Sequence, residues 1–186
     1  RLDALNRFAR RGAPWKGEDG KYYGSANDGS HNQAIIYRAD APDAEGEIFL
    51  DPNALSDDGT VALTGIFMSK DGKYTAYTIS RSGSDWTEIY VMDTATKELL
   101  PDHIEWAKFT DAAWKDNGFY YSAYARPEAG KEFSNANEYH KVYYHKIGTP
   151  QSEDIVAYED NSQPLFFHHA TVGDKGRMLA VSASGQ

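Results

Sequence analysis

A short phrase that joins a tight turn to an aromatic or aliphatic strand returns four times along the chain. Each copy has a glycine directly after an Asp, Asn or Lys, and a strand rich in Tyr or Leu follows. The four glycines are Gly20, Gly72, Gly118 and Gly176, which are 52, 46 and 58 residues apart. A period of about 40–50 residues, built from short strands and tight turns, is typical of β-propeller blades. The repeat therefore predicts an all-β fold.

A second phrase keeps the same period. It places a tyrosine inside an apolar strand at Tyr37, Tyr90 and Tyr143, and consecutive members are 53 residues apart. Between the phrases, runs of β-branched and aromatic residues alternate with turns rich in Gly, Asp, Asn and Pro, which indicates four strands in each repeat. Two phrases with one period predict a β-propeller of four-stranded blades.

The length limits the number of blades. At about 50 residues per blade, the 186 residues hold roughly three and a half blades, whereas closed propellers have at least four. An open stack of blades would leave strand edges unpaired. We therefore expect the sequence to be a piece of a larger protein, with an incomplete fourth blade.

The N-terminal residues have a different pattern. Leu2, Leu5 and Phe8 recur at helical spacing, which predicts a short helix over residues 1 to about 11. A Gly and a Pro then end the helical pattern. We therefore expect two parts, an N-terminal segment over residues 1–15 and a partial propeller over residues 16–186.

The strand patterns place the blades along the chain. The expected strands are 21–26, 33–39 and 47–50 in blade 1; 62–68, 74–80, 86–93 and 97–100 in blade 2; 107–114, 119–125, 141–146 and 155–158 in blade 3; and 165–171 and 177–183 in blade 4. Residues 126–139 are expected to form a loop insertion on one face.

Composition excludes several classes of function. The net charge of −9 argues against a nucleic-acid partner, because phosphate binding needs a basic face. No run of 18 apolar residues predicts a membrane span, so no membrane partner is expected. The absence of cysteine excludes disulfides and thiolate chemistry. It is compatible with either a cytoplasmic or a periplasmic location.

The residues alone give no catalytic candidate and no metal or cofactor site. Ser25 lies between Gly24 and Asn27-Asp28-Gly29, but a nucleophile elbow needs a helix after the serine, and the pattern here favours a turn between strands. His168 and His169 are adjacent, so in a strand they point to opposite faces. We expect one buried, hydrogen-bonded histidine there and no metal ligand.

Several longer phrases carry a resemblance to a known family. They are Leu-Asp-Pro-Asn at 50–53, Leu-Ser-Asp-Asp-Gly-Thr at 55–60, Ser-Gly-Ser-Asp-Trp at 82–86, Lys-Phe at 108–109, and the run from Tyr143 to Ile155. In this order and spacing, over roughly residues 30–160, the chain resembles the propeller of the prolyl oligopeptidase (prolyl endopeptidase) family, which are α/β-hydrolase-type serine peptidases.

The resemblance implies a seven-bladed propeller and a parent enzyme that cleaves short peptides on the carboxyl side of proline. It implies that the catalytic Ser, Asp and His lie in an α/β-hydrolase domain outside this chain, so the 186 residues alone are expected to be inactive. Residues 1–15 would be the end of a segment that packs on that domain. The expected partners are an oligopeptide substrate and the hydrolase domain of the same parent chain.

The resemblance also implies three substrate-binding residues. Phe109 matches a propeller phenylalanine that lines the substrate cavity of the family. Phe167 stands where relatives often have Met, although the local Phe-Phe-His-His departs from the Trp-Met-Gly-Gly of some relatives. Asp85 matches an acidic residue that faces the interdomain cavity and can act on a charged substrate end.

Two alternatives remain at this point. The propeller could be a non-catalytic binding platform, or it could belong to a related oligopeptidase. A Gly-x-Ser-x-Gly elbow in downstream sequence would identify an enzyme, and its absence would favour a platform.

Overall fold

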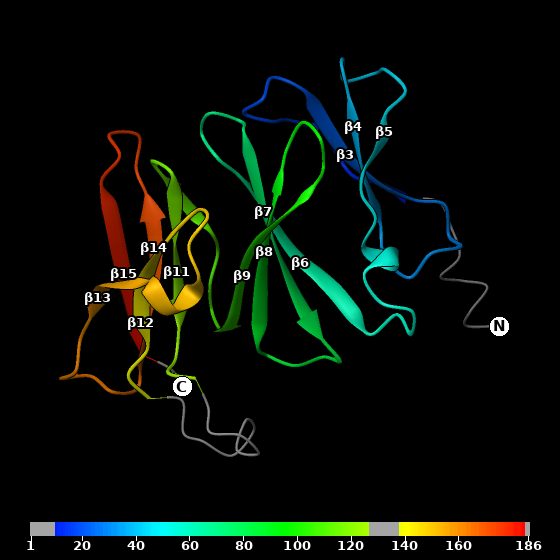
Figure 1. Cartoon of the computed structure of the whole chain (residues 1–186). Coiled ribbons are helices and arrows are strands. Elements are labelled where there is room, and N and C mark those ends of the chain that lie inside the picture. The colour runs from blue at the N-terminus through cyan, green and yellow to red at the C-terminus, as the bar shows by residue number, and fades with distance from the viewer. Residues whose placement is uncertain (1–9, 127–137, 185–186) are drawn as a thin grey trace.

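A computed structural model of the chain describes residues 10–126 and 138–184. Three antiparallel sheets contain most of these residues, and they follow one another in chain order (Figure 1). The two helical elements are short 3₁₀ turns, η1 (Pro52–Ala54) and η2 (Gln151–Glu153). Within the described ranges, no helix is long and apolar enough to cross a membrane.

The first sheet forms blade 1. Its path runs through β1 (Arg10–Arg11), β3 (Tyr22–Asn27), β4 (Ile35–Ala39) and β5 (Glu47–Leu50), and β2 (Trp15–Lys16) pairs with β3. The predicted helix falls mainly on residues 1–9, which lie outside the described residues. Arg10 and Arg11 do not continue a helix, because they pair with Asn27 and Ala26 as strand residues.

The second sheet contains blades 2 and 3. Blade 2 is formed by β6 (Val61–Met68), β7 (Tyr74–Arg81), β8 (Thr87–Asp93) and β9 (Leu99–Ala107). Blade 3 is formed by β10 (Ala113–Lys115), β11 (Gly118–Ala123), β12 (Lys141–Lys146) and β13 (Ile155–Glu159). The pair Ala107–Ala123 joins β9 to β11 and makes the two blades one sheet of eight strands. The predicted architecture of four-stranded blades is confirmed.

The third sheet is the hairpin of β14 (Phe166–Val172) and β15 (Met178–Ser184), which opens blade 4. Its inner strand contacts blade 3, since β14 lies against β10, β11 and β12. The predicted strands 165–171 and 177–183 match this hairpin to within a residue.

One blade boundary differs from the prediction. The strand expected at 97–100 is β9 and continues to Ala107, and the strand expected at 107–114 is the short β10. Pro101, which follows the expected strand directly, lies within β9, the outer strand of its blade. An edge strand tolerates proline because one side of its backbone needs no ladder partner. Of the predicted loop insertion, residues 127–137 lie outside the described residues.

The core is formed where blades face each other. Blade 2 is buried on both faces, and the central residues of β7 show this because successive side chains enter different clusters. Tyr77 and Ile79 pack with Tyr23 and Phe49 of blade 1. Ala76 joins a second cluster that blade 3 completes, with Trp114, Phe119 and Tyr121. Burial of each large apolar side chain contributes about 1.5–3 kcal/mol, so packing between blades holds the stack together.

The repeated turn phrase is not one conformation. Gly20, Gly72 and Gly176 have positive φ angles of 82°, 71° and 68°, as glycine allows. In the third copy the positive φ, 52°, falls on Asp116 instead, and Gly118 begins β11. Gly118 is needed there for space, because a Cβ would lie 2.1 Å from the His145 carbonyl oxygen.

A buried ionic cluster fixes the outer half of blade 3. His145 Nδ1 lies 2.7 Å from Asp154 Oδ1, and its Nε2 lies 3.0 Å from Asp102 Oδ1, which also accepts from the Gly148 amide. Both ring nitrogens therefore face carboxylates and the imidazole carries a charge. Burial opposes this charge, but the hydrogen bonds and charges of Asp154 and Asp102 outweigh it and raise the pKa of His145.

We predict that His145→Leu destabilises the full-length protein by about 3–5 kcal/mol, since two buried carboxylates lose their cation. Denaturant unfolding would measure this loss. Because the pKa of His145 is raised, the cluster stabilises fully below its ordinary value of 6.5, and the difference between variant and wild type narrows as pH rises through the folded-state pKa. The control is His31→Leu, since His31 is 38% exposed and pairs with exposed Asp28. Equal losses for the two variants would contradict the prediction.

A second prediction concerns steric space. Gly118→Ala should cost about 1–3 kcal/mol, because the new methyl group meets the backbone of β12. Gly24→Ala in β3 is the matched control, since a Cβ there has no atom within 4 Å, and it should change stability by less than about 0.5 kcal/mol. Urea unfolding of both variants tests the difference. Equal stability of the two variants would show that the backbone of β12 shifts to accommodate the new methyl group.

Candidate functional site

The three residues expected to bind substrate lie at one end of the sheets. Strand pairing places Thr87 opposite Ala107, Ala107 opposite Ala123, and Ala123 opposite Lys141. The turns and connections that begin at these residues therefore emerge on one side of the blades. Asp85 lies in the β7–β8 turn and Phe109 just beyond β9. Phe167 is the second residue of β14. It lies on the same side, because its ring contacts that of Phe109.

The structure brings Phe109 and Phe167 into contact. Their ring centres are 5.1 Å apart with an angle of 38° between planes, within the range of favourable aromatic pairs. Phe109 is 51% exposed, and Phe167 is half-buried. The two rings come from different blades and form an open apolar surface, named here the aromatic pair.

Lys108 joins Asp85 to this pair. Its side chain is 9% exposed, and its Nζ lies 3.5 Å from Asp85 Oδ2, whose side chain is 79% exposed. The same ammonium lies 5.2 Å from the Trp86 ring centre and 5.4 Å from that of Phe109, within cation–π range. The site therefore presents an exposed carboxylate beside an apolar surface, and a shielded cation separates them.

Large aromatic residues lie beneath Lys108. Trp86 packs edge-on against Trp106 and Tyr124, with ring centres 5.5 Å and 6.3 Å apart. Trp106 and Phe109 both have positive φ angles, 61° and 52°, which side chains with a Cβ adopt at an energetic cost. The connection after β9 is therefore bent sharply, and its surroundings must hold that bend.

His140, which the sequence analysis did not single out, supplies part of this support. Its Nε2 lies 2.9 Å from the Lys108 carbonyl oxygen, and its Nδ1 accepts from the His168 amide at 2.8 Å. Since Nδ1 accepts an N–H bond, the proton of the neutral ring is on Nε2, which donates to Lys108. No local motif marks this role, because both partners lie about 30 residues away.

The environment keeps His140 neutral. Burial is the main cause, and the nearby charges of His168 and Lys108 act in the same direction, whereas the bond to the Lys108 carbonyl opposes them. Together they lower the pKa of His140 from 6.5 to about 4. The Tyr124 ring packs on the His140 ring with a distance of 4.4 Å between ring centres, and the Phe109 ring packs edge-on against it with a distance of 6.2 Å.

The predicted buried, hydrogen-bonded histidine of the adjacent pair is His168. His168 is buried and its Nδ1 lies 2.8 Å from Ser182 Oγ. His169 is half-exposed, and its Nε2 lies 3.4 Å from Asp111 Oδ2. No group of three or more potential metal ligands occurs within residues 10–126 and 138–184.

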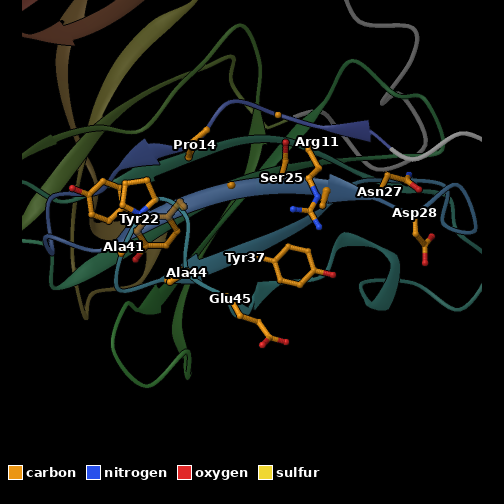
Figure 2. Close-up of a pocket in the computed structure, with 17 residues that line it drawn as sticks. Arg11, Pro14, Tyr22, Ser25, Asn27, Asp28, Tyr37, Ala41, Ala44 and Glu45 are labelled. Atoms are coloured by element: carbon orange, nitrogen blue, oxygen red, sulfur yellow. The ribbon is translucent and has the colours of Figure 1, made fainter.

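Ser25 is part of a strand and not of a nucleophile elbow. It pairs with Ile36 in β3–β4 and lines a cleft of about 560 Å³ on the outer face of blade 1 (Figure 2). Tyr22, Tyr37 and Glu45 line the same cleft. None of the three predicted substrate-binding residues does, so this cleft is separate from the site around Phe109.

The inner strands of blades 2, 3 and 4 line a second groove, of about 350 Å³. Phe67 comes from β6, Trp114 from β10 and Thr171 from β14. Asp111 and His169 also line it. In a propeller such a groove lies beside the central channel.

The chain is similar to several known proteins. A family model described as prolyl oligopeptidase, N-terminal beta-propeller domain, matches residues 1–186. The prolyl endopeptidase of Elizabethkingia meningoseptica is 41% identical over 185 residues, which cover 98% of this chain and 26% of that protein. The dual function macrocyclase-peptidase POPB of Galerina marginata is 33% identical, over 95% of this chain and 27% of that protein.

Solved structures share the fold. Prolyl oligopeptidase B from Galerina marginata, bound to a 35mer hydrolysis and macrocyclization substrate, matches with a TM-score of 0.86 and 29% identity, over 97% of this chain and 28% of that chain. A prolyl endopeptidase structure matches with a TM-score of 0.83 and 31% identity, over 100% of this chain and 26% of that chain.

The chain thus spans about a quarter of the length of the relatives it matches. The matched family model covers all 186 residues. This chain belongs to the prolyl oligopeptidase family, as part of the N-terminal β-propeller domain.

Proposed function

We propose that this chain is the substrate-selecting propeller part of a serine-type peptidase that cleaves short peptides on the carboxyl side of proline. The observation that carries the proposal is the meeting of Phe109, Phe167 and Asp85. These residues are far apart in sequence, and Lys108 and the ring contact bring them to one surface.

The chemistry of this surface suits a proline-containing peptide. The exposed face of the aromatic pair can pack on the apolar proline ring, and such burial gains about 25 cal/mol per Å². Asp85 is open to solvent, and Lys108 neutralises only one side of it. A peptide with a positively charged end therefore meets a carboxylate beside an apolar surface, which favours that orientation.

In this proposal the chain supplies no catalytic group. The nucleophilic serine and its His and Asp belong to an α/β-hydrolase domain of the same parent protein, which lies against the site end of the blades. The propeller limits access to folded proteins and admits short peptides. No cofactor or metal takes part in this mechanism, since the histidine acts as base and backbone donors stabilise the oxyanion.

Labelling with a fluorophosphonate probe tests the peptidase part of the proposal. In the full-length protein the probe should label one serine, and excess proline-containing peptide should protect it. A full-length protein that takes no label would point to the alternative, a binding platform without chemistry.

Phe109→Ala in the full-length enzyme should raise KM for a proline peptide about tenfold, equivalent to about 1.4 kcal/mol, with kcat nearly unchanged, since the lost contact is equal in substrate and transition state. Thermal stability should change little because Phe109 is half-exposed. Ile48→Ala is the control, since Ile48 is 49% exposed on blade 1, and its KM should stay at the wild-type value. A lowered melting temperature without a KM effect would show that Phe109 serves the fold instead.

A further inference from the structure

We propose that the neutral imidazole of His140 is a positioning residue that sets the spacing of the aromatic pair, and that protonation of this ring weakens peptide binding. The second half of the proposal rests on the proposed function of Phe109 and Phe167. The first half concerns the fold of this chain alone and can be tested without a substrate.

The hydrogen bonds of His140 join the two peptide groups that carry the aromatic pair. The acceptor of its Nε2–H is the Lys108 carbonyl oxygen, which belongs to the peptide bond that leads into Phe109. The donor to its Nδ1 is the His168 amide, which belongs to the peptide bond that follows Phe167. One ring therefore bridges the backbone beside Phe109 to the backbone beside Phe167.

Phe109 depends on such support. Its φ of 52° is costly for a residue with a Cβ, and its ring is 51% exposed, so side-chain packing fixes only half of it. The other backbone contact of the preceding residue is the Lys108 amide, which donates to the Ser122 carbonyl at 3.1 Å. The two bonds of Lys108 hold the bend on both sides, and His140 supplies the one that reaches blade 4.

A proton on Nδ1 would break this bridge. The protonated ring has donors at both nitrogens, and Nδ1 would then face the His168 N–H, which is also a donor. No rotation of the ring restores an acceptor for that amide. The expected result is separation of the Lys108–Phe109 peptide from β14, with loss of the ring contact between Phe109 and Phe167.

The groups around His140 favour the neutral ring. Lys108, from the connection after β9, and His168, from β14, add unfavourable charge, and Tyr124, from the end of β11, covers the ring. Burial lowers the pKa of His168, and the charge of Asp160 opposes this shift only in part. Since the pKa of His140 is lowered to about 4, the ring is neutral and the bridge is complete above pH 6.5, and about half of the rings are protonated near pH 4.

His140→Gln separates positioning from protonation. The glutamine amide can donate to the Lys108 oxygen and accept from the His168 amide, but it does not titrate. His140→Leu removes both bonds. His31→Gln, on an exposed loop of blade 1, controls for loss of a histidine elsewhere.

The test uses the full-length protein at pH 4.0 to 7.5 and a fluorescent product-like peptide that ends in proline, so that binding is measured without turnover. At pH 4.0, where about half of the His140 rings are protonated, wild type and His31→Gln should bind about twofold more weakly than at pH 7.5. His140→Gln should not show this loss over the same pH range. His140→Leu should bind weakly at every pH. If His140→Gln shows the pH dependence of wild type, the proposal is overturned.

Hydrogen exchange of residues 105–112, followed by mass spectrometry without peptide, tests the bridge itself. Exchange, corrected for its intrinsic pH dependence, should accelerate in His140→Leu and in acidified wild type, but not in His140→Gln. Faster exchange in His140→Leu, together with unchanged peptide affinity in both His140→Leu and Phe109→Ala, would support the bridge but refute the binding role of the aromatic pair. Unchanged exchange in His140→Leu would refute the bridge, whatever the peptide affinity.

Discussion

Packing of each blade face on the next is the interaction on which the other features depend, and Trp114 shows how it works. This residue of β10 stacks on Tyr74 of blade 2, packs edge-on against Phe119 of its own blade, and donates its indole N–H to the Phe67 carbonyl at 2.9 Å. One side chain thus supplies apolar burial and a directional bond across a blade boundary. Because the blades cannot slide past such contacts, the connections at their ends are held at fixed separations, and residues from three blades can form one site.

Much of the fold follows from local patterns. The common period of Tyr37, Tyr90 and Tyr143 reflects equivalent strands, since these residues lie in β4, β8 and β12. Local patterns fail where the tertiary environment decides. Pro101 stays in a strand because β9 is at the edge of its blade, and Gly118 is required by the backbone of β12 and not by a turn. Neither circumstance is visible in a window of neighbouring residues.

The residues of the candidate site also differ in whether the sequence could identify them. Phe109, Phe167 and Asp85 could be named only through a resemblance, since each is by itself an ordinary turn or packing residue. The roles of Lys108 and His140 could not be predicted, because they consist of contacts between residues 23 to 32 positions apart. The two buried histidines of blade 3, His140 and His145, show that tertiary contacts decide the charge of a residue. His145 faces two carboxylates and is charged, whereas His140 faces a carbonyl and an amide and is neutral. The sequence does not distinguish them. The stabilisation by His145 nevertheless declines as pH rises, whereas the stabilisation by His140 declines as pH falls.

The single ladder pair between blades 2 and 3, Ala107 with Ala123, has a consequence for how such a protein can change over evolution. Apart from this pair and the neighbouring bond from the Lys108 amide to the Ser122 carbonyl, the described residues of blades 2 and 3 meet mainly through side chains. The hydrogen-bond register of one blade therefore does not fix that of its neighbour. Turns such as 82–86 and connections such as 108–112 can then acquire new residues without shifting an adjacent sheet. The residues at the ends of the blades can therefore diversify while the repeated framework stays constant.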